Sequence, residues 1–277
     1  MADQIAPDFC PTTSHGMPML GLGTWQNDNP EQCAESVRNA LERGYRHIDT
    51  AQAYDNEAAV GEGIASADVD REEVFLATKI WTDNLGYEDV KETARESMDR
   101  LGVDYLDLLY VHWPAEAYEP EETLSAFAEL YDEGLIENVG VSNFMAEDLE
   151  TAIDVCDAPI AANQVELHPL LQQDDLRERC EHYDVDVVAY SPLARGQVFN
   201  HEGIQNVAAR HGVSEVQVSL AWLREKGVTA IPKATGKDHI ENNWESLLVE
   251  LDSSDIDTID NVDDVNREVD PDFAPWN

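Results

Sequence analysis

The sequence is poor in positive charge. Its 277 residues include 17 lysines and arginines against 58 aspartates and glutamates, which gives a formal net charge of −41 at pH 7. A chain with this charge repels nucleic acids and anionic membrane surfaces, and its own charges push the folded state apart. In a composition that disfavours lysine so strongly, each one that remains invites a functional explanation. The five lysines are Lys79, Lys91, Lys226, Lys233 and Lys237.

The acidic residues are spread along the whole chain, from the segment DNPEQCAE to the segment LDSSDIDTIDNVDDVNREVDPD. Salt screens such repulsion, because the Debye length falls from ~10 Å at about 0.1 M to ~3 Å at about 1 M. The composition therefore resembles that of a cytosolic protein from an extreme halophile, with an ordinary acidic protein as the alternative. We expect structure and activity to weaken as salt is removed.

Long apolar runs and paired cysteines are also absent. No run of 18 apolar residues occurs, so we expect no membrane span. The N-terminal segment MADQIAPDFCPTTSHG has neither the basic nor the apolar stretch of a signal peptide, and we expect a cytoplasmic protein. The cysteines Cys10, Cys33, Cys156 and Cys180 form no CxxC pair, which predicts buried free thiols instead of disulfides or a zinc site.

What the sequence does contain is a regular alternation of helical and strand patterns. Amphipathic segments end at Gly44, Gly102, Gly134 and Gly227, and glycine just past a helix favours a left-handed cap. Asn29 and the proline that follows it are typical of a helix start. Eight short runs rich in β-forming residues occupy 19–25, 46–49, 74–80, 105–111, 137–141, 162–166, 186–190 and 228–231.

Several of these runs are almost continuously apolar, as expected of parallel strands that are covered on both faces. Eight strand-and-helix units in about 250 residues predict an α/β fold, a (β/α)8 TIM barrel in one domain over residues 1–277. We expect a short β-hairpin over residues 5–19, with His15 and Gly16 at its turn, and a long functional loop over residues 191–203. An open doubly wound sheet is the alternative, but the segment GLGTWQ lacks the third glycine of a dinucleotide-binding turn.

Four residues of complementary chemistry fall near the carboxyl ends of three consecutive predicted strands. Asp49 ends the second strand and Tyr54 follows it, Lys79 ends the third, and His112 ends the fourth. The strand ends of a TIM barrel share one rim, and active sites lie there. Each residue alone has a structural explanation, as a cap, a packing residue, a solvated strand end or a core histidine. Together they predict an active site.

Carbonyl reduction gives a reason for this set of side chains. Hydride transfer leaves negative charge on the carbonyl oxygen, and a proton donor must meet that charge. The phenol of Tyr54 carries its proton at neutral pH, and we expect the ammonium of Lys79 to lower the pKa of Tyr54. Asp49 would hold the lysine charged and in place, and His112 would orient the carbonyl group.

The sequence resembles the aldo-keto reductase superfamily over nearly its whole length. The resemblance implies that Tyr54 is the catalytic acid, that Lys79, Asp49 and His112 assist it, and that a nicotinamide cofactor binds without a Rossmann fold. The segments that carry it occur in the order of the family. They are GYRHIDTAQAYDNEAAVG, ATKIW, LDLLYVHWP, GVSNF, NQVELHP, AYSPLARG and IPKATGKDHIENN.

The same resemblance implies a set of cofactor-binding residues. Ser142, Asn143 and Gln164 would hold the nicotinamide carboxamide, and Tyr190 would stack on its ring. Ser142 and Asn143 could instead cap the next helix, and Tyr190 could be a core residue. The loop from Ser191 to Leu193 would fold over the pyrophosphate. The remaining residues implied are Gly23, Thr24, Asp49, Lys233, Thr235, His239, Asn242 and Asn243.

One departure from the family bears on the choice of cofactor. Members that prefer NADPH commonly have Lys-Ser and then an arginine that holds the 2′-phosphate. This chain has Lys233, Ala234 and Thr235, with His239 in place of the arginine. Histidine is only partly charged near neutral pH, but Lys233 and Lys237 still offer positive charge. The sequence therefore favours NADPH, with NADH as the alternative.

The substrate site is expected to be aromatic. Trp25, Trp81 and Trp113 follow the first, third and fourth strands and would lie beside Tyr54 and His112, although each could instead fill the top of the barrel. An apolar or aromatic aldehyde or ketone would fit such a site. The tail NREVDPDFAPWN is short, so we expect little specificity from it.

We therefore predict a salt-adapted, NADPH-dependent reductase of small carbonyl compounds, reversible and monomeric, with no nucleic-acid or membrane partner and no metal. One alternative is a cofactor-binding sensory or regulatory protein with little turnover; an NADH-preferring reductase is another. A metal-dependent barrel hydrolase lacks support, because the eight histidines form no HExxH or HxH pair. Glu166 and His168 can share one face of a strand for other reasons.

Overall fold

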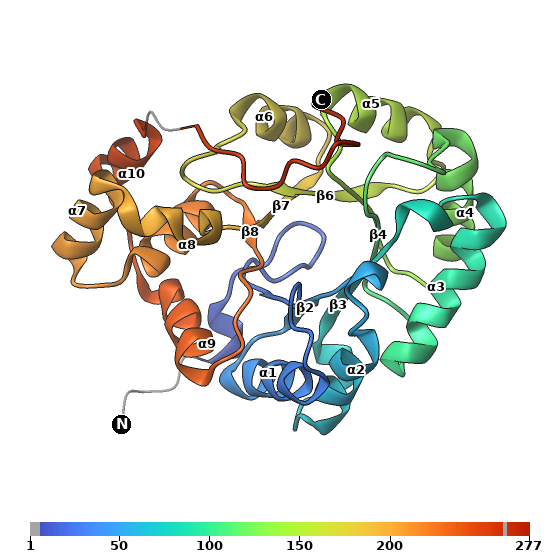
Figure 1. Cartoon of the computed structure of the whole chain (residues 1–277), viewed down its shortest axis with the longest axis horizontal. Helices are drawn as coiled ribbons and strands as arrows, with labels where there is room; N and C mark the ends of the chain where they lie inside the picture. Colours follow the sequence, from blue (N-terminus) through green and yellow to red (C-terminus); the bar gives the residue numbers. More distant parts are fainter. Residues whose placement is uncertain (1–5, 263–264) are drawn as a thin grey trace.

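Eight parallel strands form the centre of the molecule, in the same order in space as in the sequence (Figure 1). The computed structural model describes residues 6–262 and 265–277. Bridges from Leu20 to Ala230 and from Gly23 to Lys233 join the first strand segment to the last, which closes the barrel and confirms the predicted fold. The strands are β1 Leu22–Gly23, β2 His47–Asp49, β3 Phe75–Ile80, β4 Leu108–Val111, β5 Val139–Ser142, β6 Ile160–Glu166, β7 Asp186–Tyr190 and β8 Thr229–Ala230.

Helices connect the strands and surround the barrel (Figure 1). Two of them, α7 and α8, lie between β7 and β8, where the predicted long loop forms the 3-10 segment η5. The α-helices of the described residues are α1 Pro30–Arg43, α2 Glu57–Ser66, α3 Tyr87–Leu101, α4 Pro120–Asp132, α5 Ala146–Val155, α6 Asp174–His182, α7 Glu202–His211, α8 Glu215–Glu225, α9 Lys237–Trp244 and α10 Ser253–Asp260. The 3-10 segments are η1 Pro7–Phe9, η2 Gln52–Tyr54, η3 Arg71–Glu73, η4 Thr82–Asn84, η5 Ala194–Asn200 and η6 Glu245–Leu248.

The helix ends lie where the sequence signals predicted them. Asn29 caps α1, and its side-chain oxygen accepts a hydrogen bond of 2.9 Å from the backbone N–H of Gln32. Gly102 follows α3 with a φ angle of 69°, a left-handed conformation that glycine adopts without strain. The other three predicted cap glycines also have positive φ angles.

Strand side chains alternate between the barrel interior and the layer between barrel and helices. In β3, Leu76 and Ile80 pack in the larger core between barrel and helices, whereas Phe75 and Ala77 belong to a smaller cluster inside the barrel. This inner cluster consists of Met17, Phe75, Ala77, Leu108, Tyr110, Ala162, Val188 and Ile231. Lys79 follows Phe75 and Ala77 at the same period of two, so its side chain points into the barrel. The same alternation turns the polar residues near the other strand ends inward. These residues are Asp49, His112, Ser142, Gln164, Glu166 and Tyr190.

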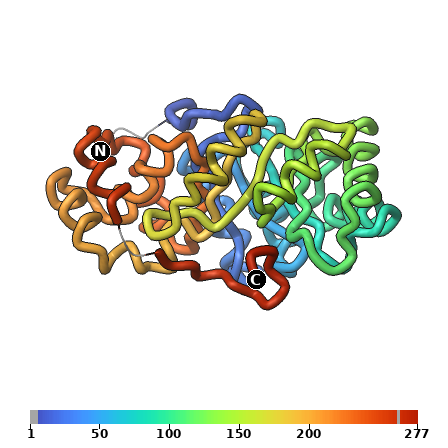
Figure 2. The backbone as a smooth tube through the Cα atoms, turned by 90° about the horizontal axis from the view of Figure 1, so that it is seen from above, coloured from blue at the N-terminus to red at the C-terminus, as the bar shows by residue number. Residues whose placement is uncertain are grey.

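Segments from the two ends of the chain cover the two ends of the barrel (Figure 2). Near the N-terminus, Thr12 and Pro18 form an antiparallel bridge, and Gly16 turns the chain with a φ angle of 77°. The predicted hairpin is therefore present, joined by that bridge; residue 5 of its predicted range lies outside the described residues. Met17 from this hairpin packs into the inner cluster. Residues 265–277 lie across the opposite end.

The cysteines carry free thiols, as the sequence predicted. Cys10, Cys33 and Cys180 are buried, whereas Cys156 is only partly buried. Among residues 6–262 and 265–277, no helix combines the length and the apolar character that crossing a bilayer requires.

Candidate active site

A cavity of about 1050 Å³ opens at the carboxyl ends of the barrel strands. Fifteen of the residues that the sequence analysis assigned to a site line its wall, and Lys79 is fully buried beneath it. The fifteen are Gly23, Thr24, Trp25, Asp49, Tyr54, Trp81, His112, Trp113, Ser142, Asn143, Gln164, Tyr190, Ser191, Leu193 and Lys233.

The buried lysine is held by three oxygens. Its ammonium donates hydrogen bonds to a carboxylate oxygen of Asp49 and, over 2.8 Å, to the backbone carbonyl of Thr50. It also lies 3.4 Å from the phenol oxygen of Tyr54. The second oxygen of Asp49 accepts a bond of 2.7 Å from Gln164. Burying an ammonium and a carboxylate is costly unless they are paired and hydrogen-bonded, and this arrangement meets both conditions.

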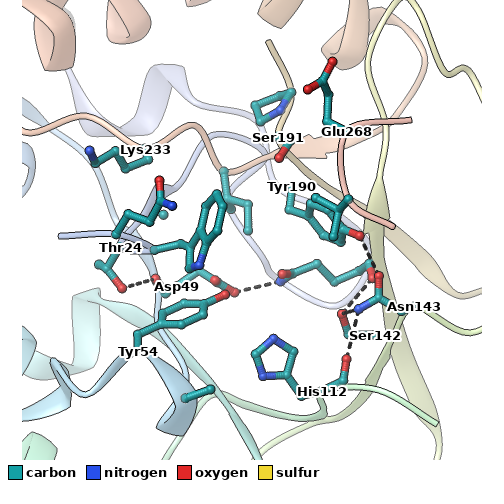
Figure 3. Close-up of a pocket in the computed structure, with 18 of the residues that line it drawn as sticks. Thr24, Asp49, Tyr54, His112, Ser142, Asn143, Tyr190, Ser191, Lys233 and Glu268 are labelled. Atoms are coloured by element: carbon teal, nitrogen blue, oxygen red, sulfur yellow. Dashed lines mark hydrogen bonds between the residues drawn. The ribbon is translucent and has the colours of Figure 1, made fainter. Parts of the chain in front are cut away.

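The segment that carries Tyr54 is fixed from the side by Gln52. The amide oxygen of Gln52 accepts from the backbone N–H of Trp81 over 3.0 Å and from the side chain of Asn84 over 3.2 Å. Its amide nitrogen donates to the carbonyl of Thr93 over 3.1 Å. Asp55 then turns the chain with a φ angle of 53°. These contacts hold Tyr54 over the barrel mouth, where Figure 3 shows its hydroxyl directed toward the cavity.

His112 forms the opposite side of the same space (Figure 3). Its ring lies edge-on to the ring of Tyr54, at 5.8 Å between centroids, and to that of Trp81, at 5.1 Å. Burial, with a further contribution from Lys79, holds the pKa of His112 well below 6.5. The imidazole is therefore neutral at pH 7 and can donate one hydrogen bond to a carbonyl oxygen in the cavity.

The acidity of Tyr54 differs from the sequence prediction. Burial raises the pKa of Tyr54 well above 10.0, and the Asp49 carboxylate raises it further. Burial lowers the pKa of Lys79, and Asp49 opposes that effect. The predicted net lowering of the Tyr54 pKa is wrong, because burial disfavours the phenolate more than the nearby Lys79 ammonium favours it, and the Asp49 carboxylate adds to the effect of burial. The phenol stays protonated throughout the neutral range.

A hydrogen-bonded row of polar side chains forms another wall of the cavity (Figure 3). The hydroxyl of Tyr190 donates to the amide oxygen of Asn143 over 2.7 Å. The amide nitrogen of Asn143 donates to the carbonyl of His112 over 3.0 Å and to the hydroxyl of Ser142 over 3.1 Å.

The alternative that Ser142 or Asn143 caps the next helix does not hold. The N-cap position of α5 is occupied by Met145.

Four of the residues predicted to bind the cofactor do not line the cavity. Thr235 precedes α9, and His239, Asn242 and Asn243 lie on it. His239 is exposed, whereas Asn242 accepts a bond of 3.1 Å from Ser214 at the start of α8. The structure therefore does not bring these four residues into the cavity with Tyr54, Lys79 and His112.

The sequence analysis did not select Arg195 and expected little specificity from the C-terminal tail, yet both line the cavity. The guanidinium of Arg195 lies 5.0 Å from the ring centroid of Trp25. Arg195 could have been found from the sequence, because an arginine in a long loop is unusual in a chain so poor in basic residues. The tail could have been found from the aromatic residues in its otherwise acidic sequence. The tail residues in the wall are Glu268, Val269, Asp270, Pro271 and Phe273.

Among residues 6–262 and 265–277, no group of three or more histidine, cysteine or acidic side chains is arranged to hold a metal ion. The side chains of this site offer a phenol, a buried ammonium and a neutral imidazole around one cavity. Amide and hydroxyl groups on the adjoining wall can hydrogen-bond a second bound molecule.

The chain is similar in sequence and in structure to known proteins. Residues 19–264 match the family described as "Aldo/keto reductase family". An aldo-keto reductase from Mycobacterium sp. (strain JLS) is 40% identical over 267 residues, 95% of each chain. Glyoxal reductase from Bacillus subtilis (strain 168) is 39% identical over 244 residues, 88% of each chain. The crystal structure of an aldo/keto reductase from Brucella melitensis aligns with a TM-score of 0.86 and 37% identity, over 91% of this chain and 98% of that one.

Proposed function

The chain belongs to the aldo/keto reductase family, and we propose that it reduces aldehydes and ketones with NADPH, using Tyr54 as the proton donor. As a member of this family, the protein is an oxidoreductase that acts on carbonyl groups with a nicotinamide cofactor. The observation that carries the proposed mechanism is the contact of Lys79 with both Asp49 and the Tyr54 hydroxyl at the base of the cavity.

The residues present fit a nicotinamide cofactor. Ser142, Asn143 and Gln164 offer hydroxyl and amide groups along one wall, and the ring of Tyr190 stands beside them. These groups suit the carboxamide and the ring of a nicotinamide. Positive charge for phosphate groups is also available on the wall, from Arg195 and Lys233. When bound, the reduced nicotinamide supplies a hydride to the carbonyl carbon.

The protein's own side chains handle the proton. A carbonyl oxygen placed between Tyr54 and His112 accepts a hydrogen bond from each. As negative charge develops on that oxygen, the phenol transfers its proton to it. The ammonium of Lys79 stabilises the phenolate that remains, and Asp49 with the Thr50 carbonyl keeps the ammonium in position. Because the pKa of Tyr54 is raised above its ordinary value of about 10, the phenol keeps its proton throughout the neutral pH range.

The test of this mechanism is Tyr54→Phe, assayed as cofactor oxidation with a panel of aldehydes and ketones in concentrated KCl. We expect kcat to fall by about 10²–10⁴-fold, the usual contribution of a positioned acid. Tyr131→Phe is the matched control, because Tyr131 is an exposed residue of α4 that does not line the cavity. Full turnover by the Tyr54 variant would disprove the assignment.

The preference for NADPH is proposed from the distribution of positive charge. Lys79, Lys91 and Lys226 form ion pairs with Asp49, Glu129 and Asp260. Among the described residues, the other two lysines, Lys233 and Lys237, form no ion pair. In a protein with an excess of acids, these two cations, one at the start of α9 and one just before it, suit the additional phosphate of NADPH.

Lys233→Met tests the cofactor preference. We expect the affinity for NADPH to fall by about tenfold, because a charge-assisted hydrogen bond is lost, while the affinity for NADH changes little. Affinity is measured by cofactor titration, with Lys91→Met on α3 as the control. A wild-type protein with much higher kcat/KM for NADH, or an equal loss of both affinities in the variant, contradicts the proposal.

We further propose that the enzyme is a monomer of the cytoplasm adapted to molar salt. The support for the salt adaptation is the net charge of −41. Even if every basic residue paired with one acid, most of the acids would have no partner. Screening by concentrated salt removes the resulting repulsion.

A further inference from the structure

Glu166, the last residue of β6, is a fully buried carboxylate that the proposed mechanism does not use. One of its oxygens accepts a hydrogen bond of 2.7 Å from the backbone N–H of Glu268, and the other accepts one of 2.9 Å from the backbone N–H of Val269. The imidazole of His168 lies 2.9 Å from the first oxygen. A buried carboxylate is costly without donors, and two of its three come from a segment about a hundred residues away.

The bound segment leads directly into the wall of the cavity. After Val269, the chain places Phe273 edge-on against Trp113, at 5.4 Å between ring centroids, and against Trp81, at 6.4 Å. Trp276 packs on Trp113 at 5.6 Å, and the guanidinium of Arg267 lies 3.9 Å from the ring of Trp276. The tail thus covers the end of the cavity where Trp81 and His112 meet.

A second contact joins the tail to the same part of the barrel. The backbone N–H of Asn266 donates to the carbonyl of Leu170 over 2.9 Å, next to the turn in which His168 and Leu171 bridge to each other. Residues 266–269 are therefore held through their backbone. Glu166 accepts two of these three backbone bonds, so this barrel residue contributes most of the hydrogen bonding that fixes the tail there.

We propose that Glu166 is a positioning residue that holds the C-terminal tail across the substrate end of the cavity and so sets selectivity for aromatic carbonyl substrates. The selectivity rests on the proposed function; the anchoring does not. Glu166→Gln replaces one acceptor oxygen with an NH₂ group that faces a backbone N–H. The tail amides then lose a charged acceptor and are better satisfied by water, which favours an open tail.

Proteolysis tests the anchoring without any need for turnover. Trypsin cleaves after arginine, and the partly buried guanidinium of Arg267 packs on the ring of Trp276 while the tail is closed. In concentrated KCl, we expect cleavage after Arg267, followed by mass spectrometry, to be about tenfold faster in Glu166→Gln than in the wild type. Glu178→Gln, an exposed residue of α6, is the control with the same change in charge. An unchanged cleavage rate in Glu166→Gln overturns the proposal, whatever the activity.

Steady-state kinetics test the selectivity. For Glu166→Gln we expect the KM for benzaldehyde to rise by about tenfold, while kcat and the KM for methylglyoxal, a smaller carbonyl, stay within about twofold of the wild type. In a Phe273→Ala background, the substitution at Glu166 should raise the benzaldehyde KM no further. Equal losses for both substrates, or the same rise in both backgrounds, contradict the proposal.

Phe273→Ala keeps the proposal testable if Glu166→Gln does not fold, as judged by circular dichroism. The KM for benzaldehyde should then rise more than the KM for methylglyoxal, since Phe273 is the tail residue that contacts both tryptophans of the substrate end. An equal change in the two values overturns the proposal. If the wild type reduces no carbonyl compound, the proposed function fails, and proteolysis still decides whether Glu166 holds the tail.

Discussion

At the scale of single residues, surroundings decide which tyrosine can act as an acid. Tyr45 is fully buried and donates a hydrogen bond of 3.1 Å to the carbonyl of Ile240, so it serves packing. Tyr110 lies in the inner cluster and does not reach the cavity wall. Tyr54 alone among these three combines contact with the Lys79 ammonium and a place on that wall. The surroundings of Tyr54 therefore suit proton transfer, whereas those of Tyr45 and Tyr110 suit packing.

His112 allows a prediction about stability and pH. Its pKa is held well below 6.5 in the folded state, whereas in the unfolded chain it takes up a proton near pH ~6.5. Below that pH the unfolded state binds more protons, so stability is lost as pH falls from about 6.5 toward the lowered folded value, by up to ~1.4 kcal/mol per pH unit.

We expect His112→Gln to flatten this part of the stability curve. The free energy of unfolding is measured by urea denaturation in concentrated KCl, from about pH 5 to about pH 7, a range that includes the unfolded pKa of ~6.5. Burial also lowers the pKa of His47, which is present in both proteins, so its contribution cancels in the comparison. Identical slopes for the wild type and the variant would refute the prediction.

At the scale of elements, close packing of α2 supports the segment that carries Tyr54. A Cβ atom at Gly61 would lie 2.3 Å from the backbone carbonyl oxygen of Leu101, at the end of α3. One at Gly63 would lie 2.6 Å from the Cβ of Val37 on α1. Helix α2 begins just after η2, so any shift that relieves these contacts also moves the segment that carries Tyr54.

Gly61→Ala should therefore destabilise the protein. Alanine improves helix propensity by ~1 kcal/mol, but overpacking against backbone costs about 1–3 kcal/mol, so we expect a net loss and a lower kcat. Thermal unfolding measures the loss. Gly236→Ala is the control, since a Cβ there has nothing within 4 Å. A Gly61 variant as stable as the wild type would show that α2 and α3 can separate at no cost.

At the scale of the whole molecule, charge is the dominant feature. With 58 acidic and 17 basic residues, repulsion acts over the entire surface and no single ion pair can relieve it. Surface pairs such as Arg95 with Glu133 contribute little individually. Stability should thus follow ionic strength more strongly than it follows any single substitution on the surface.

We expect the unfolding temperature and the reductase activity to fall together when KCl is lowered from about 1 M, where the Debye length is ~3 Å, to about 0.1 M, where it is ~10 Å. Differential scanning fluorimetry and initial rates measure the two quantities. Replacing KCl with an uncharged osmolyte of equal osmotic strength is the control, because it does not screen charge. Full stability at low salt would exclude salt adaptation.

Local patterns in the sequence determined much of the fold and part of the site. The alternation of short apolar strand runs with amphipathic helical segments, the cap glycines and Asn29 predicted the barrel, and the strand ends brought Asp49, Lys79 and His112 to one rim. These features depend on residues a few positions apart, so sequence alone contains them. The chemistry of a phenol beside an ammonium could likewise be read from residue types.

Tertiary structure alone decided what depends on distant contacts. Glu166 meets the tail amides about a hundred residues away, and Arg195 reaches Trp25 across the barrel mouth. The direction of the Tyr54 pKa shift also needed the structure, because burial and the position of Asp49 outweigh the lysine. Desolvation and long-range contact depend on how the chain surrounds a group, and no short stretch of sequence contains that information.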